Sequence, residues 1–286
     1  MNQRIKDIAP IEASSREFHM SKQNFKKISE IIYEHAGIVL KEVKEDMVYS
    51  RVSRRIRVTR CRGFDDYLVL ALDTKGSEFT HFVNAITTNL TSFFRESHHF
   101  DFIKQTAIPE WKKTPTRTKL RIWSAGSSTG EEAYSIAMTL DGEIPKTWDT
   151  KILATDLDTN VVAQGSSGIY GPERISGLSK PLASQYFDKI SVDGKPQVQV
   201  KKVLRDMAFF KPLNLLQGWP MSGSFDMIFC RNVVIYFDKP TQKVLFDRYA
   251  DLLAPGGYLI IGHSESMYKL SDRFTSIGNT IYRKVK

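Results

Sequence analysis

The chain has 286 residues, of which 41% are hydrophobic and 26% charged, a balance typical of a folded protein with one or two domains. It contains no apolar run near the roughly 18 residues of a membrane-spanning helix, and its N-terminus lacks the apolar core of a secretory signal. Two cysteines, Cys61 and Cys230, are too few for a disulfide framework, so we expect a cytoplasmic protein with reduced thiols. The net charge of +9 indicates an electronegative partner, such as nucleic acid, a membrane surface or an acidic protein.

The first 87 residues predict a flexible N-terminus (1–20) followed by a small basic helical domain (21–87). The clearest helix covers residues 44–63, because apolar residues recur there every four positions and form one face. These residues are Val48, Val52 and Ile56. Further helices are predicted over residues 21–37, 64–72 and 78–87.

The predicted helix 44–63 is also strongly basic. Six arginines and no acidic residue occur between residues 51 and 62. We predict that Arg51, Arg54 and Arg57 form a docking surface, because opposite charges steer and orient an acidic partner. For any single arginine, a solvated charged face is the alternative.

Residues 88–105 are predicted to form a linker that contributes to a ligand site. The sequence TTNLTSFFRESHHF (87–100) brings together threonines, an asparagine, paired phenylalanines and an arginine. A segment of this composition can lie over a ligand as a lid. The alternative is an ordinary linker in which Phe93 and Phe94 fill a core between domains. His98 and His99 do not predict a metal site, since adjacent residues of a helix point about 100° apart.

From residue 106 to the C-terminus, short apolar strands alternate with helices. This α/β pattern predicts a Rossmann-like, mostly parallel sheet with its ligand at the carboxyl ends of the strands. The tail DRFTSIGNTIYRKV is expected to add an antiparallel hairpin. Residues 172–205 make the connection between the second and third predicted strands longer than a single helix needs. They predict a small inserted β-subdomain whose hairpin turns at Asp193-Gly194.

The turn after the first of these strands, in WSAGSSTGEEAYSIA (123–137), consists of small residues that let backbone amides approach a ligand. Glu131 and Glu132 follow at the helix start, where two carboxylates would repel a phosphate. Asp156 ends the next strand, 25 residues beyond Glu131, an offset typical of an acid that binds ribose hydroxyls. Together they indicate an adenosine ligand with a positive centre and no phosphate, such as S-adenosylmethionine. The alternative is that Glu131 and Asp156 only cap helices.

Six segments, taken in order, resemble the chemotaxis receptor protein-glutamate O-methyltransferases, the CheR family. They are TTNLTSFFRE, WSAGSSTGEEAYSIA, ATDLDTNVV, SGIY, FDMIFCRNVVIYFDK and GGYLIIGHSES. The resemblance covers the chain from about residue 21 to its end. It implies a class I S-adenosylmethionine-dependent methyltransferase domain (106–286) with an N-terminal all-α domain. It also implies methyl transfer to glutamate carboxylates of chemoreceptors in chemotactic adaptation, with S-adenosylhomocysteine as the product.

The resemblance further implies site residues and partners. Arg95 and Tyr236 would lie nearest the transferring methyl and act in catalysis. The cofactor contacts would be Asn89, Thr91, Arg95, Glu131, Asp156, Asn214, Leu215, Arg231 and Asn232. The partner would be the cytoplasmic helical domain of chemoreceptors, and in some family members the β-subdomain also captures a short C-terminal receptor peptide. No metal, nucleic acid or membrane insertion is expected, and the protein is expected to be a monomer.

Two small departures from the family pattern do not touch the implied chemistry. Ala133 follows the paired glutamates where the family often has proline, and Ser127 stands where cysteine is common. Two other readings remain at this stage. One is a sensor that binds S-adenosylmethionine without transferring its methyl group. The other is a nucleic-acid methyltransferase, suggested by the positive charge, although CRNVVIYF replaces the N-P-P-Y-like motif of many base methyltransferases.

Overall fold

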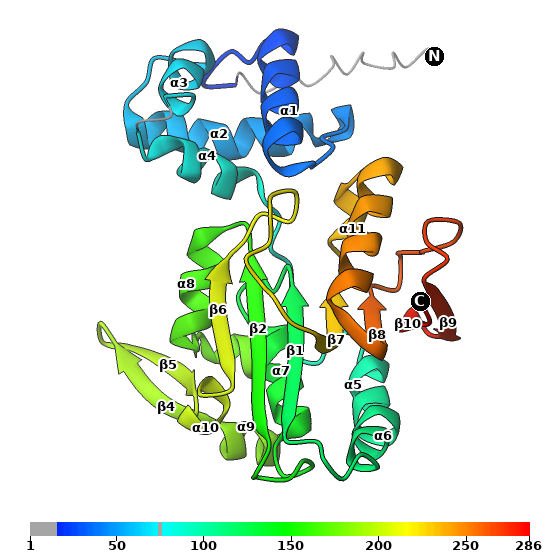
Figure 1. The fold of residues 1–286 in the computed structure, drawn as a ribbon. Coiled ribbons are helices and arrows are strands. Elements are labelled where there is room, and N and C mark those ends of the chain that lie inside the picture. Colours follow the sequence, from blue (N-terminus) through cyan, green and yellow to red (C-terminus); the bar gives the residue numbers. More distant parts are fainter. Residues whose placement is uncertain (1–15, 74–75) are drawn as a thin grey trace, which may run out of the picture.

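The computed structural model describes residues 16–73 and 76–286. A helical part, formed by the N-terminal segment, lies above the carboxyl ends of a large sheet (Figure 1). Most of the predicted flexible N-terminus, residues 1–15, lies outside the described residues. None of the helices described is both long and apolar enough to cross a membrane.

The helical part contains α1 (Lys22–Ala36), α2 (Glu45–Thr59), α3 (Phe64–Ala71) and α4 (Glu78–Ile86). Helix α1 starts where predicted, because the Ser21 hydroxyl accepts a hydrogen bond from the Asn24 amide at 3.1 Å. It ends at Gly37, whose left-handed backbone (φ 69°) suits glycine. The predicted apolar face of α2 forms the centre of the helical core, and its three residues are fully buried: Val48, Val52 and Ile56.

The segment between the helical part and the sheet begins as an extended linker and then becomes helical. It forms α5 (His98–Phe102), a π-helical turn (Ile103–Ala107) and α6 (Ile108–Lys112). The predicted linker 88–105 is therefore helical in its second half. His99 is fully buried, and its Nε2 lies 3.0 Å from the Asn279 carbonyl oxygen, which joins α5 to the C-terminal hairpin.

The main sheet has seven strands in the order β6-β2-β1-β7-β8-β10-β9. The first five are parallel, and β10 runs antiparallel to both of its neighbours, which confirms the predicted C-terminal hairpin. The strands are β1 (Lys119–Ala125), β2 (Asp149–Asp156), β6 (Ala208–Pro212), β7 (Phe225–Cys230), β8 (Leu253–Ile261), β9 (Phe274–Gly278) and β10 (Ile281–Lys284).

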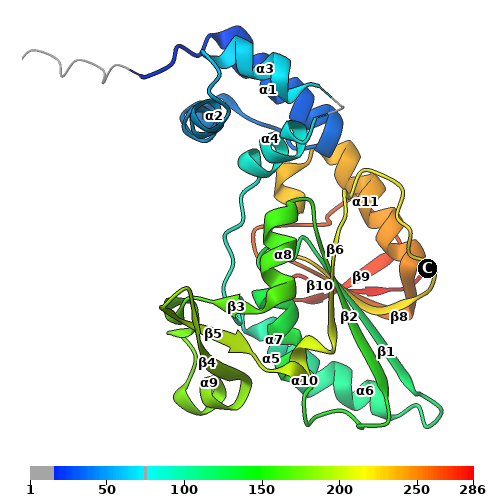
Figure 2. The same ribbon diagram turned by 90° about the vertical axis from the view of Figure 1, so that its left-hand side faces the viewer.

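Helices cover both faces of this sheet (Figure 2). Neighbouring residues of β1 point to opposite faces, so Ile122 packs in one core with residues of α7, whereas Trp123 packs in the other with residues of α11. The helices around the sheet are α7 (Glu131–Leu140), α8 (Thr159–Ser167), α10 (Lys202–Arg205) and α11 (Lys239–Leu252).

A second, small antiparallel sheet projects from the body of the molecule (Figures 1 and 2). Its strands lie in the order β3-β5-β4, and α9 (Lys180–Tyr186) precedes β4. The strands are β3 (Ile169–Tyr170), β4 (Phe187–Val192) and β5 (Lys195–Val200). The hairpin turns at Asp193 and Gly194, which both have positive φ, as predicted. Its third strand, β3, begins before the predicted insert boundary at residue 172.

Candidate active site

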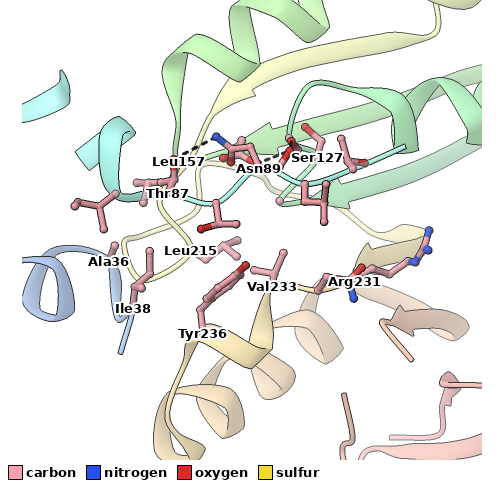
Figure 3. Close-up of a pocket in the computed structure, with 18 of the residues that line it drawn as sticks. Ala36, Ile38, Thr87, Asn89, Ser127, Leu157, Leu215, Arg231, Val233 and Tyr236 are labelled. Atoms are coloured by element: carbon pink, nitrogen blue, oxygen red, sulfur yellow. Dashed lines mark hydrogen bonds between the residues drawn. The ribbon is translucent and has the colours of Figure 1, made fainter. Parts of the chain in front are cut away.

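An open pocket lies where the carboxyl ends of β1, β2 and β7 meet the helical part (Figure 3). Its empty volume, which includes space open to solvent, is about 1210 Å³, enough for a nucleoside-sized ligand and part of a substrate. The helical part contributes the loop after α1 to the lining. The loop supplies Ile38, Val39 and Leu40, and the last residue of α1, Ala36, lines the pocket beside them.

The small turn after β1 forms one wall of the pocket. Its first two amides, those of Gly126 and Ser127, both donate to the Thr155 carbonyl oxygen at 2.8 Å, which ties the turn to β2. Gly126 has φ 82°, and a Cβ there would lie 2.3 Å from Val233 Cγ2. A side chain at Gly126 would therefore displace the loop after β7.

Asp156 lies at the end of β2 and faces the pocket. Its carboxylate accepts backbone hydrogen bonds from Ser128 at 2.8 Å and from Asp158 at 3.0 Å. Burial raises the pKa of Asp156 to about 6, against the opposing effect of these two amides. When ionised, this carboxylate has lone pairs left for the hydroxyls of a ribose.

The pocket residues fit S-adenosylmethionine. Leu157 and Leu215 offer apolar contacts for a base, and Asp156 and Glu132 provide acceptors for hydroxyl and amino groups. Ser127 also lines the pocket, and its hydroxyl oxygen is buried and lacks a hydrogen-bond partner within the described structure. A buried polar atom without a partner is unusual, which fits a turn that is completed by a ligand.

The two paired glutamates have different positions. Glu132 lines the pocket and accepts a hydrogen bond from the Ser124 hydroxyl at 2.7 Å. The predicted cofactor contact, Glu131, is outside the lining, because its carboxylate forms an ion pair with Arg174 and accepts from the Thr129 hydroxyl at 2.6 Å. No cofactor contact was predicted for Glu132, although it stands beside Glu131 at the start of the same helix.

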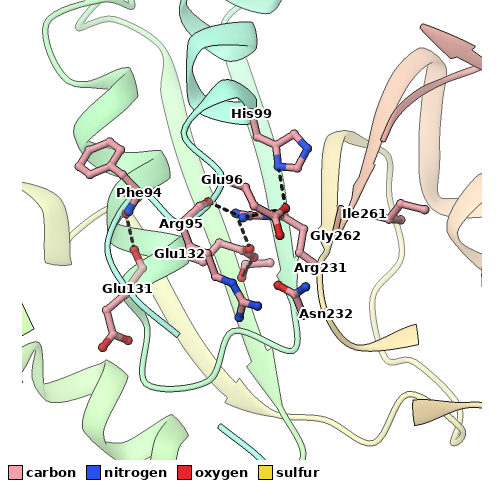
Figure 4. A network of polar contacts seen from close by, with 12 residues as sticks. Phe94, Arg95, Glu96, His99, Glu131, Glu132, Arg231, Asn232, Ile261 and Gly262 are labelled. Atoms are coloured by element: carbon pink, nitrogen blue, oxygen red, sulfur yellow. Dashed lines mark hydrogen bonds and ion pairs between the residues drawn. The ribbon is translucent and has the colours of Figure 1, made fainter. Parts of the chain in front are cut away.

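Arg231 is the centre of a buried charged network (Figure 4). Its guanidinium lies 3.2 Å from both the Glu96 and the Glu132 carboxylates and also donates to the Arg95 carbonyl oxygen. Burial alone would raise the pKa of Glu96, but a hydrogen bond from His263 and the charge of Arg231 lower it to about 2. The network therefore joins the linker, α7 and the loop after β7, and it favours the ionised form of Glu96.

The linker follows the pocket wall and supplies three predicted residues to the lining: Asn89, Thr91 and Arg95. The Asn89 side chain donates to Asp158 at 2.7 Å, and its carbonyl oxygen accepts from the Ser128 hydroxyl at 3.0 Å. The Arg95 guanidinium donates to the Leu90 carbonyl oxygen at 2.9 Å. The linker is thus fixed by hydrogen bonds on both sides of Leu90.

The other predicted residues come from two loops. Asn214, Leu215, Asn232 and Tyr236 all line the pocket, as does Arg231. The Asn214 amide donates to the His35 carbonyl oxygen at 2.6 Å, and the Tyr236 carbonyl oxygen accepts from the Val39 amide at 2.8 Å. The Tyr236 ring points into the pocket (Figure 3). Every predicted site residue outside α2 except Glu131 therefore lies in one lining.

The predicted docking arginines of α2 differ in their surroundings. Arg51 is half-buried and donates to the carbonyl oxygens that end α4, including that of Ile86 at 2.8 Å. Arg57 is exposed and forms an ion pair with Glu17 at 2.7 Å. Arg54 is exposed and forms no ion pair in the described part of the chain. Arg51 thus holds two helices together, and only Arg54 and Arg57 are on the open surface.

Known proteins resemble this chain over most of its length. The family model for the all-alpha domain of CheR methyltransferases matches residues 23–87, and that for their SAM-binding domain matches residues 89–283. Among solved structures, N-methyltransferase NodS from Bradyrhizobium japonicum with S-adenosyl-L-homocysteine is 12% identical, with a TM-score of 0.37, over 65% of this chain and 88% of that one. Chemotaxis protein methyltransferase 2 of Pseudomonas aeruginosa is 42% identical and covers 94% of this chain and 95% of its own. For the chemotaxis protein methyltransferase of Escherichia coli, the identity is 42%, over 92% of this chain and 91% of that protein.

Proposed function

This chain belongs to the CheR methyltransferase family, and we propose that it methylates glutamate side chains of chemoreceptors. We also propose that the predicted pocket residues bind the cofactor and place the substrate for this reaction. The enzyme depends on S-adenosylmethionine, and its reaction serves chemotactic adaptation. The observation that carries the proposed residue roles is the single pocket in which Asp156, Arg95 and Tyr236 all face the same space.

The chemistry needs positioning more than proton transfer. When bound, S-adenosylmethionine supplies a methyl group on a positively charged sulfur. A glutamate carboxylate, with an ordinary pKa near 4.3, is already ionised at neutral pH and needs no general base. The described pocket offers no Ser-His-Asp or Cys-His arrangement, in line with this requirement. Aligned placement of reacting groups can supply roughly 7–11 kcal/mol of barrier reduction.

We assign the placement of the substrate carboxylate to Arg95 and Tyr236. Both line the pocket, and the Arg95 guanidinium already donates to the Leu90 carbonyl oxygen. This contact uses one of the five N–H donors of the guanidinium and leaves the others for a carboxylate. The pairing must stay moderate, because the carboxylate charge disappears in the transition state and a very strong ion pair would favour the ground state.

The cofactor contacts are assigned to the pocket residues around the sheet edge. We assign the ribose to Asp156 and a positively charged group of the cofactor to Glu132, whose carboxylate faces the pocket where Glu131 does not. Asn89, Thr91, Asn214, Leu215, Arg231 and Asn232 complete this assignment.

We assign receptor docking to the exposed arginines of α2. Arg54 and Arg57 lie on α2, and the start of the same helix lines the pocket through Lys44 and Met47, so an acidic receptor helix bound along α2 would lead to the pocket. The outer strand β4 of the small sheet has one edge unpaired within the described structure, and a C-terminal receptor peptide could add to it as a strand.

The function is tested by incubating the protein with methyl-tritiated S-adenosylmethionine and a chemoreceptor cytoplasmic fragment from the same organism. Label that mild alkali releases as volatile methanol would establish a carboxyl methyl ester. Cofactor binding without label transfer to any receptor would instead support the sensor reading. Label that resists alkali would show transfer to nitrogen or carbon and would contradict glutamate as the substrate.

A further inference from the structure

Glu265 lies in the loop after β8 and is only 6% exposed. Its carboxylate accepts three backbone hydrogen bonds, from Gly262 at 2.6 Å, Asn232 at 2.9 Å and Ile235 at 3.2 Å. Two of these donors belong to the loop after β7, which carries the pocket residues Asn232 and Tyr236. Glu265 itself is outside the pocket lining, so its contacts reach the site through this loop, although its charge also helps to raise the pKa of the pocket residue Glu132.

We propose that Glu265 is a positioning residue that holds the loop 231–236 so that Asn232 and Tyr236 face the cofactor and the substrate. This inference rests on the function proposed above. Three amide donors converge on one carboxylate, so the positions of two loops are fixed by a single side chain. A shift of the loop by a fraction of an ångström would move the Tyr236 hydroxyl away from the reacting carboxylate.

The same loop is held from its other side by Gln242 in α11. The Gln242 side-chain nitrogen donates to the carbonyl oxygens of Val234 at 2.8 Å and Phe237 at 2.9 Å, and this side chain is also buried. Glu265 thus binds amides on one side of the turn, and Gln242 binds carbonyl groups on the other. Between them the short helical turn Val234–Tyr236 is fixed in both directions.

The loop has a conformation that needs such support. Asn232 has a left-handed backbone with φ 59°, a conformation that asparagine adopts more readily than most residues other than glycine. The adjacent Gly262 leaves no room for a side chain, since a Cβ there would lie 2.8 Å from the Asn232 amide nitrogen. An uncommon backbone conformation and close packing therefore coincide where Glu265 makes its hydrogen bonds.

A carboxylate is an expensive group with which to stabilise a fold alone. Burial disfavours its charge and raises the pKa of Glu265, while the backbone amides lower it. In the part of the chain that the structure describes, Glu265 forms no ion pair that would offset the burial. A carboxylate held by backbone amides, two of them from the site loop, fits a role in geometry better than one in general stability.

The test compares Glu265→Gln with Asp226→Asn. Asp226 serves as the control, because its carboxylate also accepts a backbone hydrogen bond, from Arg121 at 2.8 Å, and is also largely buried, although unlike Glu265 it forms an ion pair, with Arg117 at 2.6 Å. It lies at the start of β7, at the opposite end of the strand from the site. Each variant is assayed for methyl transfer to the receptor fragment, binding of S-adenosylhomocysteine, thermal unfolding, and hydrogen exchange of the peptide that covers residues 231–237.

In Glu265→Gln, one amide donor of the loop faces an NH₂ group instead of an acceptor oxygen. We expect kcat to fall about tenfold or more, with a change in receptor KM of less than about threefold, and exchange to accelerate in the loop. Asp226→Asn should lower thermal stability while its kcat and the exchange of the loop stay at wild-type values. If the glutamine variant does not fold, Gln242→Leu should give the same fall in kcat.

Two results would overturn the proposal. One is a wild-type kcat in Glu265→Gln. The other is a loss of activity that follows thermal stability equally in both variants without faster exchange of the loop. If the wild-type protein transfers no methyl to any receptor, the proposed function fails. The exchange measurement then still decides whether Glu265 holds the loop.

Discussion

Asp156 and Glu132 place two carboxylates in one pocket under different local conditions. Asp156 is held by two backbone amides, and its pKa is raised to about 6. Glu132 is largely buried, and burial raises its pKa, but Arg231 and the Ser124 hydroxyl oppose this effect. The first titrates within reach of ordinary buffers, so it provides a test of the pocket that needs no receptor.

Cofactor affinity should therefore depend on pH through Asp156. The pKa of an aspartate in the unfolded chain is about 3.9, and that of Asp156 in the folded protein is about 6. Asp156 therefore takes up a proton when the protein folds at a pH between about 4 and 6. A protonated carboxyl has fewer acceptor sites for ribose, so affinity for S-adenosylhomocysteine should fall below about pH 6, by at most about tenfold per pH unit. Isothermal titration calorimetry across this range measures the effect.

Asp156→Asn supplies the control for this titration. The amide cannot ionise, so the variant should bind more weakly at neutral pH and lose the step near pH 6. A step of the same size in the asparagine variant would assign the titration to another group and contradict this role of Asp156.

Tyr236 provides a second prediction for a single residue. Tyr236→Phe removes the hydroxyl that we assign to the substrate carboxylate and keeps the ring that lines the pocket. We expect kcat to fall by about 10- to 100-fold, while the affinity for S-adenosylhomocysteine changes less than about threefold. Normal turnover would remove the hydroxyl from the mechanism, and equal loss of affinity would make Tyr236 a cofactor contact instead.

At the scale of the element, α2 has two different sides. Its apolar residues fill the helical core, and Arg55 forms a largely buried ion pair with Glu78 at 2.6 Å. Glu78 also accepts from the Tyr67 hydroxyl at 2.8 Å, which joins α2, α3 and α4. The exposed side carries Arg54 and Arg57. Substitutions on the two sides should therefore have separable effects.

Charge reversal on α2 tests this separation. Arg54→Glu should lower kcat/KM for the receptor about tenfold, with unchanged cofactor affinity, because an exposed charge acts on encounter and orientation. Arg51→Glu should instead lower the midpoint of thermal unfolding, since the carbonyl oxygens that end α4 lose their donor. The comparison is made by steady-state assays at two salt concentrations and by thermal melts. If Arg54→Glu leaves the receptor kinetics and their salt dependence unchanged, α2 is not the docking surface.

Local patterns explain which elements could be predicted. The four-residue spacing of Val48, Val52 and Ile56 specified the buried face of α2, and the Asp193-Gly194 pair specified the hairpin turn. Neither pattern depends on distant residues. The role of Arg51 depends on carbonyl groups 34 to 36 positions later in the chain, and periodicity shows the face on which a side chain lies but not its partner.

The same limit applies to the site. Asp156 could be predicted because the end of a parallel strand places a residue at the ligand edge of the sheet. The contacts of Glu96 with Arg231, 135 positions apart, and of Glu265 with Asn232, 33 positions apart, arise only when several loops meet. The position of Glu265 after the carboxyl end of β8 was a signal for its role, but it could not indicate which amides the carboxylate would accept.

At the scale of the whole molecule, the pocket belongs to both parts of the chain. The loop after α1 lines it, and the hydrogen bonds between His35 and Asn214 and between Val39 and Tyr236 join that loop to the two loops of the sheet. The Tyr33 hydroxyl also donates to Asp238 at 2.7 Å, beside the start of α11. The helical part therefore forms one wall of the pocket and also contains the proposed docking helix α2.

A ligand in this pocket should therefore stabilise the helical part together with the sheet. Binding at about 100 times the dissociation constant stabilises a protein by about 2.7 kcal/mol. We expect S-adenosylhomocysteine to slow hydrogen exchange in the loop at residues 36–40 as well as in the turn at residues 126–130, because both line the pocket. The peptide covering β9 lies away from the pocket and gives the reference for global stabilisation. Protection of the turn with none in the loop beyond that reference would show that the helical part does not close on the cofactor. Contact with the cofactor would then not explain how α2 is oriented relative to the pocket.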